Sequence, residues 1–158
     1  LVVADVYDEA LDRARGLGIA VVAADKIYDQ ECDIFSSCAL GGTINKETIP
    51  RLKAVVVAGG ANNQLATAED GEELHRRGIL YAPDYILNAG GIINVSAEIG
   101  GPYNADRARE KTERIYEIIG RVIEISQTRE VPTSLAADQM AEQRLNSVRS
   151  IKNLYRPG

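Results

Sequence analysis

Residues 55–65 have the sequence VVVAGGANNQL, in which a short apolar run passes directly into two glycines and a pair of asparagines. Four similar β-rich runs lie at residues 1–4, 19–23, 33–35 and 79–82. Helix-like or turn-rich stretches separate these runs, and this alternation is typical of strands joined by crossovers in a parallel sheet. We therefore expect an α/β fold of the doubly wound, Rossmann-like class.

The helical pattern supports this interpretation. Residues 6–15 carry Ala10, Leu11 and Ala14 at helical spacing and end at Gly16 and Gly18, as expected of a βαβ crossover. After Gly91 the pattern becomes helical. The expected features there are an N-cap at Asn104, an apolar stripe from Ile115 to Ile125, a break at Pro132, and a last helix capped by Thr133 or Ser134 that runs to about Leu154.

A single domain is predicted for residues 1–158. The sheet and its crossovers occupy about residues 1–103, and C-terminal helices occupy residues 104–155.

Composition excludes several partners. The chain has 18 basic and 23 acidic residues, a formal net charge of −5 and a pI of about 5.0, so the cationic surface of a nucleic-acid-binding protein is not expected. No apolar run approaches the roughly 20 residues that span a bilayer, so a membrane partner is not expected either. Cys32 and Cys38 have no histidine near them in sequence, which argues against a metal site or a disulfide and favours a cytoplasmic protein.

Ligands of doubly wound sheets bind at the carboxyl ends of the strands, where this sequence is rich in small and polar residues. Asp5 follows the first run, and residues 36–42, 59–65 and 83–91 follow the third, fourth and fifth. Glycines and amides at three strand ends indicate a backbone that comes close to a flat, polar ligand. Asp5 alone has two interpretations: it accepts hydrogen bonds from an adenosine ribose and disfavours NADP, or it caps the following helix.

Three segments carry a resemblance to a known family. They are residues 31–42 (ECDIFSSCALGG), 57–65 (VAGGANNQL) and 78–91 (GILYAPDYILNAGG). In this order and spacing they resemble the cofactor-binding, C-terminal domain of the glutamate/leucine/phenylalanine/valine dehydrogenases, and the likeness is closest to the leucine and valine branch. The resemblance implies NAD-dependent, reversible oxidative deamination of a branched-chain L-amino acid to its 2-oxo acid and ammonia.

The resemblance also implies roles for individual residues. Asp5 and Val6 would flank the adenosine ribose, and Ala39 and Leu40 would lie against the cofactor. The remaining cofactor-binding residues would be Gly60, Ala61, Asn62 and Asn88. Asn62 would also approach the substrate amino group, and Cys38 is expected to be a small buried side chain rather than a nucleophile.

Substrate specificity is predicted to depend on residues 88–95. If a helix begins there, Ile92 and Val95 share one face, and two branched side chains leave room for an aliphatic substrate. The alternative is that both residues pack in the core.

The family's catalytic lysines and aspartate, and the glycine-rich pyrophosphate turn, find no match in the chain. We therefore expect an incomplete Rossmann-like domain without its first βα unit and without the upstream amino-acid-binding domain. Such a chain would be inactive alone and homo-oligomeric in its full-length form. The alternatives are a glutamate or phenylalanine dehydrogenase of the same fold, a non-catalytic dinucleotide-binding module, and a structural oligomerisation domain.

Overall fold

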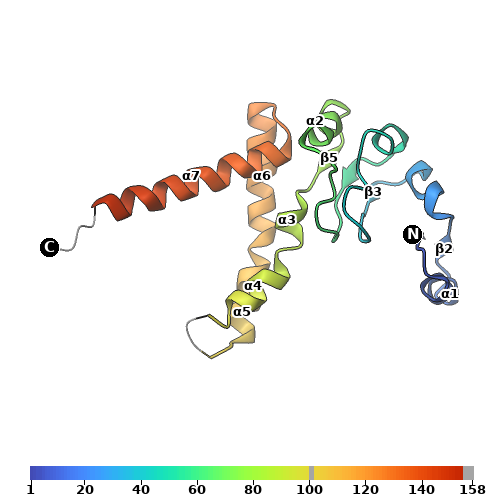
Figure 1. The fold of residues 1–158 in the computed structure, drawn as a ribbon, viewed down its shortest axis with the longest axis horizontal. Coiled ribbons are helices and arrows are strands. Elements are labelled where there is room, and N and C mark those ends of the chain that lie inside the picture. The colour runs from blue at the N-terminus through green and yellow to red at the C-terminus, as the bar shows by residue number, and fades with distance from the viewer. Residues whose placement is uncertain (100–101, 155–158) are drawn as a thin grey trace.

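The computed structural model describes residues 1–99 and 102–154 and shows an α/β fold (Figure 1). Strands form within each of the predicted runs, although each is shorter than the run that contains it. They are β1 (Val2–Val3), β2 (Ala20–Val21), β3 (Ile34–Phe35), β4 (Val56–Val57) and β5 (Leu80–Tyr81), and every pairing between them is parallel. The predicted parallel α/β class is confirmed.

The strands belong to two sheets where one was expected. β1 pairs with β2 in a two-stranded sheet, and β4 lies between β3 and β5 in a three-stranded sheet. Among the described residues no strand joins β1 to β3, so each sheet ends at an open edge. Figure 1 shows the β1–β2 unit at one end of the molecule, beside the three-stranded sheet.

The crossover helices have nearly the predicted positions. α1 (Asp8–Gly16) joins β1 to β2, and the 3-10 helices η1 (Ala24–Asp29) and η2 (Ile49–Arg51) lie in the connections on either side of β3. α2 (Ala68–Arg76) joins β4 to β5, and a capping box at its start uses the side chains of Thr67 and Asp70. Two short helices, α3 (Asp84–Leu87) and α4 (Gly90–Ser96), follow β5.

The C-terminal layer consists of α5 (Ala105–Glu113), α6 (Ile115–Arg129) and α7 (Thr133–Leu154). Asn104 caps α5 as predicted, because its side chain accepts a hydrogen bond from Arg107 N. The prediction of a cap at Thr133 or Ser134 is wrong: α7 begins at Thr133, whose hydroxyl donates instead to the carbonyl of Tyr81. Residue 155, the end of the predicted helical layer, and residues 100–101 lie outside the described residues.

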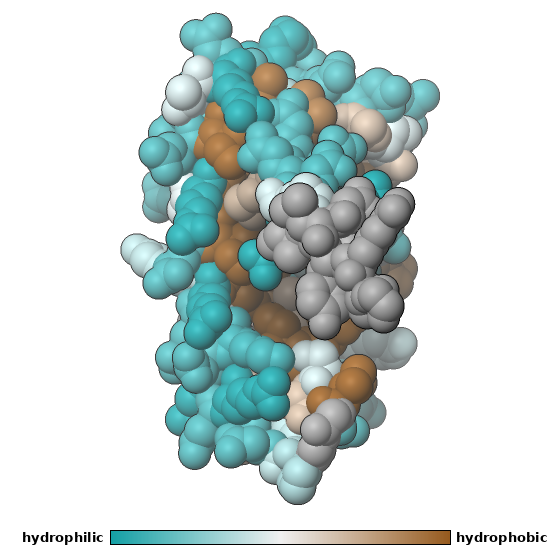
Figure 2. Space-filling model, turned by 90° about the vertical axis from the view of Figure 1, so that its left-hand side faces the viewer, coloured by the Kyte–Doolittle hydropathy of each residue, from teal (hydrophilic) through white to brown (hydrophobic). Residues whose placement is uncertain are grey.

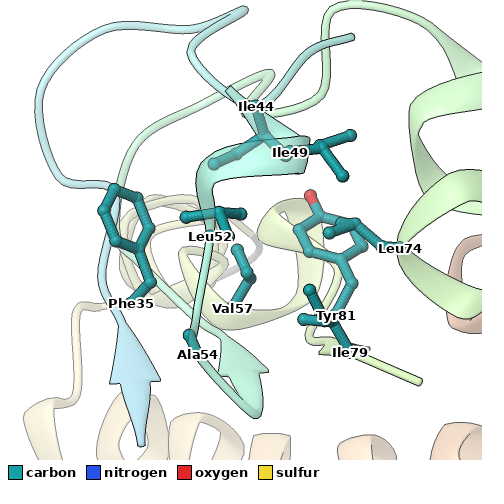
Figure 3. Packing of buried hydrophobic residues seen from close by; sticks show 9 residues of the cluster. All are labelled: Phe35, Ile44, Ile49, Leu52, Ala54, Val57, Leu74, Ile79 and Tyr81. Carbon is teal, nitrogen blue, oxygen red and sulfur yellow. The ribbon is translucent and has the colours of Figure 1, made fainter. Parts of the chain in front are cut away.

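The main core covers one face of the three-stranded sheet. Phe35, Val57 and Tyr81 share a register and point to this face, where the remaining buried side chains of the cluster meet them (Figure 3). Those side chains are Ile44, Ile49, Leu52, Ala54, Leu74 and Ile79. On the opposite face Ile34 is exposed, so only one side of this sheet is fully covered.

A second cluster joins α3 to the C-terminal helices. Ile86 of α3 packs with Val122 of α6 and with Ala136 and Ala137 of α7. Figure 2 views the molecule from the side of α7, where apolar side chains lie between hydrophilic ones. Farther along, α7 runs away from the rest of the chain (Figure 1). None of the described helices is long and apolar enough to cross a bilayer.

Candidate active site

The loops that follow β3 and β4 lie directly against each other. Ala61 N donates to Ser37 O at 3.0 Å. A Cβ atom added to Gly59 would lie 2.0 Å from the same oxygen, so only glycine allows this approach of the two backbones. The glycines after β4, which predicted a ligand-facing loop, therefore lie where two loops contact each other.

The glycine pair after β3 makes a second contact with the same loop. Gly42 N donates to Asn63 O at 2.7 Å, and a Cβ atom added to Gly41 would lie 2.8 Å from Asn62 O. Residues 36–42 and 59–65, which were predicted separately as ligand-facing segments, thus form one surface.

Asn62 and Asn88 are brought together from different strand ends. Asn88 Nδ2 donates to Asn62 Oδ1 at 2.6 Å, and the same nitrogen lies 3.5 Å from Ala61 O. Asn62 is exposed, so its amide can both donate to and accept from a polar ligand.

Gln64 supports this loop from inside the protein. Its side chain is fully buried, and Nε2 donates to Gly59 O at 2.7 Å and to Ala61 O at 3.0 Å. No role was predicted for Gln64 from the sequence. The glycine turn indicated backbone carbonyl groups that need a donor, but the sequence did not show which side chain would supply it.

Asp84 supports the loop from the other side. It is buried, and Oδ2 accepts from Asn63 N at 2.5 Å while Oδ1 accepts from the Tyr81 hydroxyl at 2.8 Å. Burial, with the hydrogen bond to Asp84 as a second cause, raises the pKa of Tyr81 well above its usual range, so this phenol is a neutral donor. No role was predicted for Asp84 from the sequence either.

Asp5 and Val6 lie at the end of β1, on the separate two-stranded sheet. Asp5 Oδ1 accepts from Val6 N at 2.7 Å and from Tyr7 N at 3.0 Å. The alternative that Asp5 caps the helix is wrong, because α1 begins at Asp8 with Tyr7 in the N-cap position. Asp5 and Val6 are both exposed. Among the described residues, no hydrogen bond joins either of them to Asn62.

The small residues of the two loops differ in exposure. Ala39, Leu40 and Gly60 are exposed, whereas Ala61 is buried. Cys38, predicted to be buried, is also exposed; its Sγ lies 3.5 Å from Gly60 N and 3.3 Å from Ser36 Oγ. The prediction of burial was wrong because the turn after β3 directs residue 38 outward, toward the Gly60 backbone.

Ile92 and Val95 lie on α4, as the predicted helix requires. Their exposed fractions are 73% and 58%, so the alternative that both pack in the core does not hold for this chain. Two exposed branched side chains three residues apart on α4 share one helical face, and this apolar face follows Asn88 in the sequence.

The chain, including these loops, is similar to proteins of a known family. The family model described as Glutamate/Leucine/Phenylalanine/Valine dehydrogenase matches residues 6–151. The chain is 49% identical over 156 residues to a leucine dehydrogenase of Bacillus subtilis and 51% identical over 156 residues to one of Thermoactinomyces intermedius. These alignments cover 98% of the chain and 43% and 42% of the respective relatives.

A solved structure has the same fold. The crystal structure of L-tryptophan dehydrogenase from Nostoc punctiforme superposes with a TM-score of 0.88 at 42% identity, covering 93% of this chain and 45% of that one. The parallel α/β fold and its superposition on this dehydrogenase place the chain among Rossmann-type domains. The chain belongs to the glutamate/leucine/phenylalanine/valine dehydrogenase family, and it spans less than half the length of the curated relatives named here.

Proposed function

We propose that this chain is the NAD-binding part of an amino acid dehydrogenase. The full-length enzyme would catalyse the reversible oxidative deamination of a branched-chain L-amino acid to its 2-oxo acid and ammonia. The observation that carries the proposal is the surface formed by residues 36–42 and 59–65, where Asn62 is exposed beside Asn88. Identities of 49–51% to leucine dehydrogenases support the choice of substrate class.

The residues present fit the two ends of a dinucleotide. The Asp5 carboxylate, oriented by the amides of Val6 and Tyr7, suits the hydroxyls of an adenosine ribose, and its charge disfavours a further phosphate. Ala39, Leu40, Gly60 and Ala61 would provide the small-residue surface for the nicotinamide half, with Asn62 and Asn88 as its polar groups. NAD, when bound, would supply the acceptor for the hydride of the amino acid.

The substrate side chain would meet α4. Ile92 and Val95 offer an apolar surface without a charge, which favours an aliphatic side chain over the carboxylate of glutamate. Asn62 would contact the substrate amino group. The catalytic lysine and aspartate are expected upstream of this chain, in an amino-acid-binding domain that the relatives' greater length allows.

The separation of the two sheets supports a further part of the proposal. In the doubly wound order, a first βα unit places its strand between the two halves of the sheet, here between β1 and β3. We propose that the full-length protein supplies this unit and that it carries the missing pyrophosphate turn. A cytoplasmic homo-oligomer is the expected form.

The test is a substrate survey of the full-length enzyme. We expect NADH formation, followed at 340 nm, with leucine, valine or isoleucine and NAD, and slower turnover of phenylalanine and glutamate. The 158-residue chain alone should show no activity, because general acid and base groups must lie within reach of the amine. A preference for glutamate or phenylalanine would correct the substrate, and binding of NAD without any turnover would favour a dinucleotide sensor.

A further inference from the structure

We infer that Asp84 is a positioning residue for the Asn62 amide. This inference rests on the proposed function and concerns how the site is held in shape. Asp84 begins α3, and Asn88 is the C-cap residue of the same single helical turn. Both ends of α3 therefore bind the loop after β4: Asp84 through Asn63 N, and Asn88 through Asn62 Oδ1.

The contact between Asp84 and Asn63 matters because of the backbone at residue 63. Asn63 has φ of +51°, in the left-handed region, which glycine adopts freely and asparagine more readily than most other residues. A carboxylate that accepts from the Asn63 N–H favours this conformation over the extended alternatives. Asn62 is the preceding residue, so the direction of its side chain depends on this turn.

Because Asp84 is buried, its carboxylate depends on the hydrogen bond from Asn63 N. Asp84 is 7% exposed, and a buried carboxylate is stable only when its oxygens accept hydrogen bonds. Among the described residues the recorded donors to its side chain are Asn63 N and the Tyr81 hydroxyl. Loss of the Asn63 contact would leave one oxygen buried without a donor, so the loop and α3 are held in one arrangement.

The remaining support of α3 comes from the helical layer. Ile86, in the middle of the turn, packs against Val122, Ala136 and Ala137. α3 thus has a fixed support on its apolar side and binds the Asn62–Asn63 turn through its polar ends. Asp84 itself reaches the loop backbone and the Tyr81 phenol, so its effect on the reaction passes through Asn62.

The chain offers a matched control. Asp138 on α7 also accepts from a tyrosine hydroxyl, that of Tyr85, at 3.1 Å. It is exposed, and no recorded hydrogen bond links it to residues 59–65. Tyr85 lies on α3, and its hydroxyl also donates to Ser134 O at 3.3 Å, so in Asp138→Ala this helix keeps a contact with α7 and both of its hydrogen bonds to the Asn62–Asn63 turn.

The experiment compares full-length wild-type enzyme with Asp84→Ala, Asp84→Asn and Asp138→Ala. Active sites are counted by NADH fluorescence titration, and kcat is expressed per NADH-binding site. We expect Asp84→Ala to lower kcat about 10- to 100-fold, because small misplacements of a substrate-orienting group have effects of that size. The Kd for NADH should change less than about threefold, because the adenosine contacts proposed at Asp5 lie on the separate β1–β2 sheet.

The Asp84→Asn variant tests whether kcat depends on the position of the hydrogen-bond acceptor or on its negative charge. In Asp84→Asn the amide oxygen can still accept from Asn63 N while its NH₂ group faces the Tyr81 oxygen, so most of kcat should return. Asp138→Ala should retain wild-type kcat. If Asp84→Ala yields no folded enzyme, Asp84→Glu tests the positioning role instead. This variant keeps the charge but moves the carboxylate by one methylene, so it should also lower kcat.

A second readout is independent of turnover. Hydrogen exchange followed by mass spectrometry should show faster exchange of the 59–65 peptide in Asp84→Ala, by about tenfold or more, and no change in Asp138→Ala. Unchanged exchange of this peptide, or a kcat per binding site within twofold of wild type in the folded Asp84→Ala variant, would overturn the inference. If the wild-type enzyme turns over no amino acid, the proposed function fails, while the exchange of the 59–65 peptide still decides whether Asp84 holds the turn.

Discussion

Asn88 Nδ2 donates to Asn62 Oδ1 across 2.6 Å, which joins the C-cap of α3 to the loop after β4. The bond uses one lone pair of the Asn62 carbonyl. Among the described residues, no other recorded hydrogen bond involves the Asn62 side chain. Asn62 can therefore offer a ligand two N–H donors and a second lone pair, which suits a ribose hydroxyl or an amine.

Replacing Asn88 tests this relationship. Asn88→Ala removes the donor that orients Asn62, and an ordinary hydrogen bond contributes about 0.5–1.5 kcal/mol. We expect kcat/KM of the full-length enzyme for NAD to fall about two- to tenfold. The control is Asn146→Ala, at an exposed position on α7, which should leave steady-state kinetics unchanged. Equal kinetics in both variants would show that Asn62 needs no such partner.

The cofactor preference is predicted to depend on Asp5. In Asp5→Ser the negative charge at the end of β1 disappears, so the repulsion of a 2′-phosphate should weaken. We expect poorer binding of NAD and a fall of about tenfold or more in the ratio of kcat/KM for NAD over NADP. Asp12→Ser, at an exposed acid on α1 that pairs with Arg15, is the matched control. An unchanged ratio in Asp5→Ser would remove Asp5 from the ribose site.

The substrate pocket is predicted to include Ile92. Ile92→Ala shortens a side chain of the proposed substrate pocket, so the ratio of kcat/KM for phenylalanine over valine should rise about tenfold, which corresponds to about 1.4 kcal/mol. Because Ile92 is exposed in this chain, the substitution should not cost the 2–5 kcal/mol typical of a core cavity. Thermal melting and kinetics on this variant and on the equally exposed Ile99→Ala separate the two roles. A large loss of stability with an unmoved substrate ratio would place Ile92 in a core instead.

The contact between the two loops is predicted to require Gly59. In Gly59→Ala the new methyl would overlap the Ser37 backbone, which cannot move as a flexible side chain can. We expect a loss of about 3 kcal/mol or more in the free energy of unfolding. Gly16→Ala is the control, since its Cβ atom would meet nothing within 4 Å and alanine favours the helix that ends there. Comparable melting temperatures in the two variants would contradict the contact.

Stability at alkaline pH is predicted to depend on Tyr81. Burial raises the pKa of Tyr81 in the folded chain, so above the unfolded value of about 10 the unfolded state loses this proton first. The stability that Tyr81 contributes is fully present below that pH and declines as pH rises toward the folded pKa, by at most about 1.4 kcal/mol per pH unit. Melting temperatures between pH 8 and pH 11 should therefore fall less steeply in Tyr81→Phe than in wild type. Parallel curves would exclude Tyr81 as a source of the alkaline destabilisation.

The strands and most helices could be predicted because their signals are local. Alternating apolar runs and the glycines after β3 and β4 mark where the chain turns, and Asn104 marks a helix start. The division into two sheets could not be predicted, because strand pairing depends on which neighbours are present. Similarly, a single helix was expected after Asn104, whereas α5 and α6 meet at Arg114.

The supporting residues of the site were missed for a related reason. Gln64 donates to carbonyl groups of the loop and Asp84 accepts from a loop N–H. Nearly every residue carries such backbone groups, so the sequence does not show which of them a side chain will bind. The exposure of Cys38 was mispredicted because the direction of a turn residue depends on the neighbouring Gly60 loop. The residues proposed to face a ligand were chosen from resemblance and chemistry and stay predictions, whereas the residues that hold their loop became apparent only in the three-dimensional arrangement.

The short interval between α3 and α4 has an evolutionary consequence. Asp84 and Asn88, which bind the Asn62–Asn63 turn, lie at the ends of α3, whereas Ile92 and Val95 lie on the next helix. Mutations that reshape the apolar face of α4 can therefore accumulate without disturbing the hydrogen bonds around Asn62. On the proposal that α4 sets the substrate preference, we expect a lineage with this arrangement to acquire new preferences through changes on α4 while α3 and its loop are kept. Relatives named for leucine, phenylalanine and tryptophan are all at least 43% identical to this chain, and we expect the residues that distinguish them to lie on α4 more often than on α3.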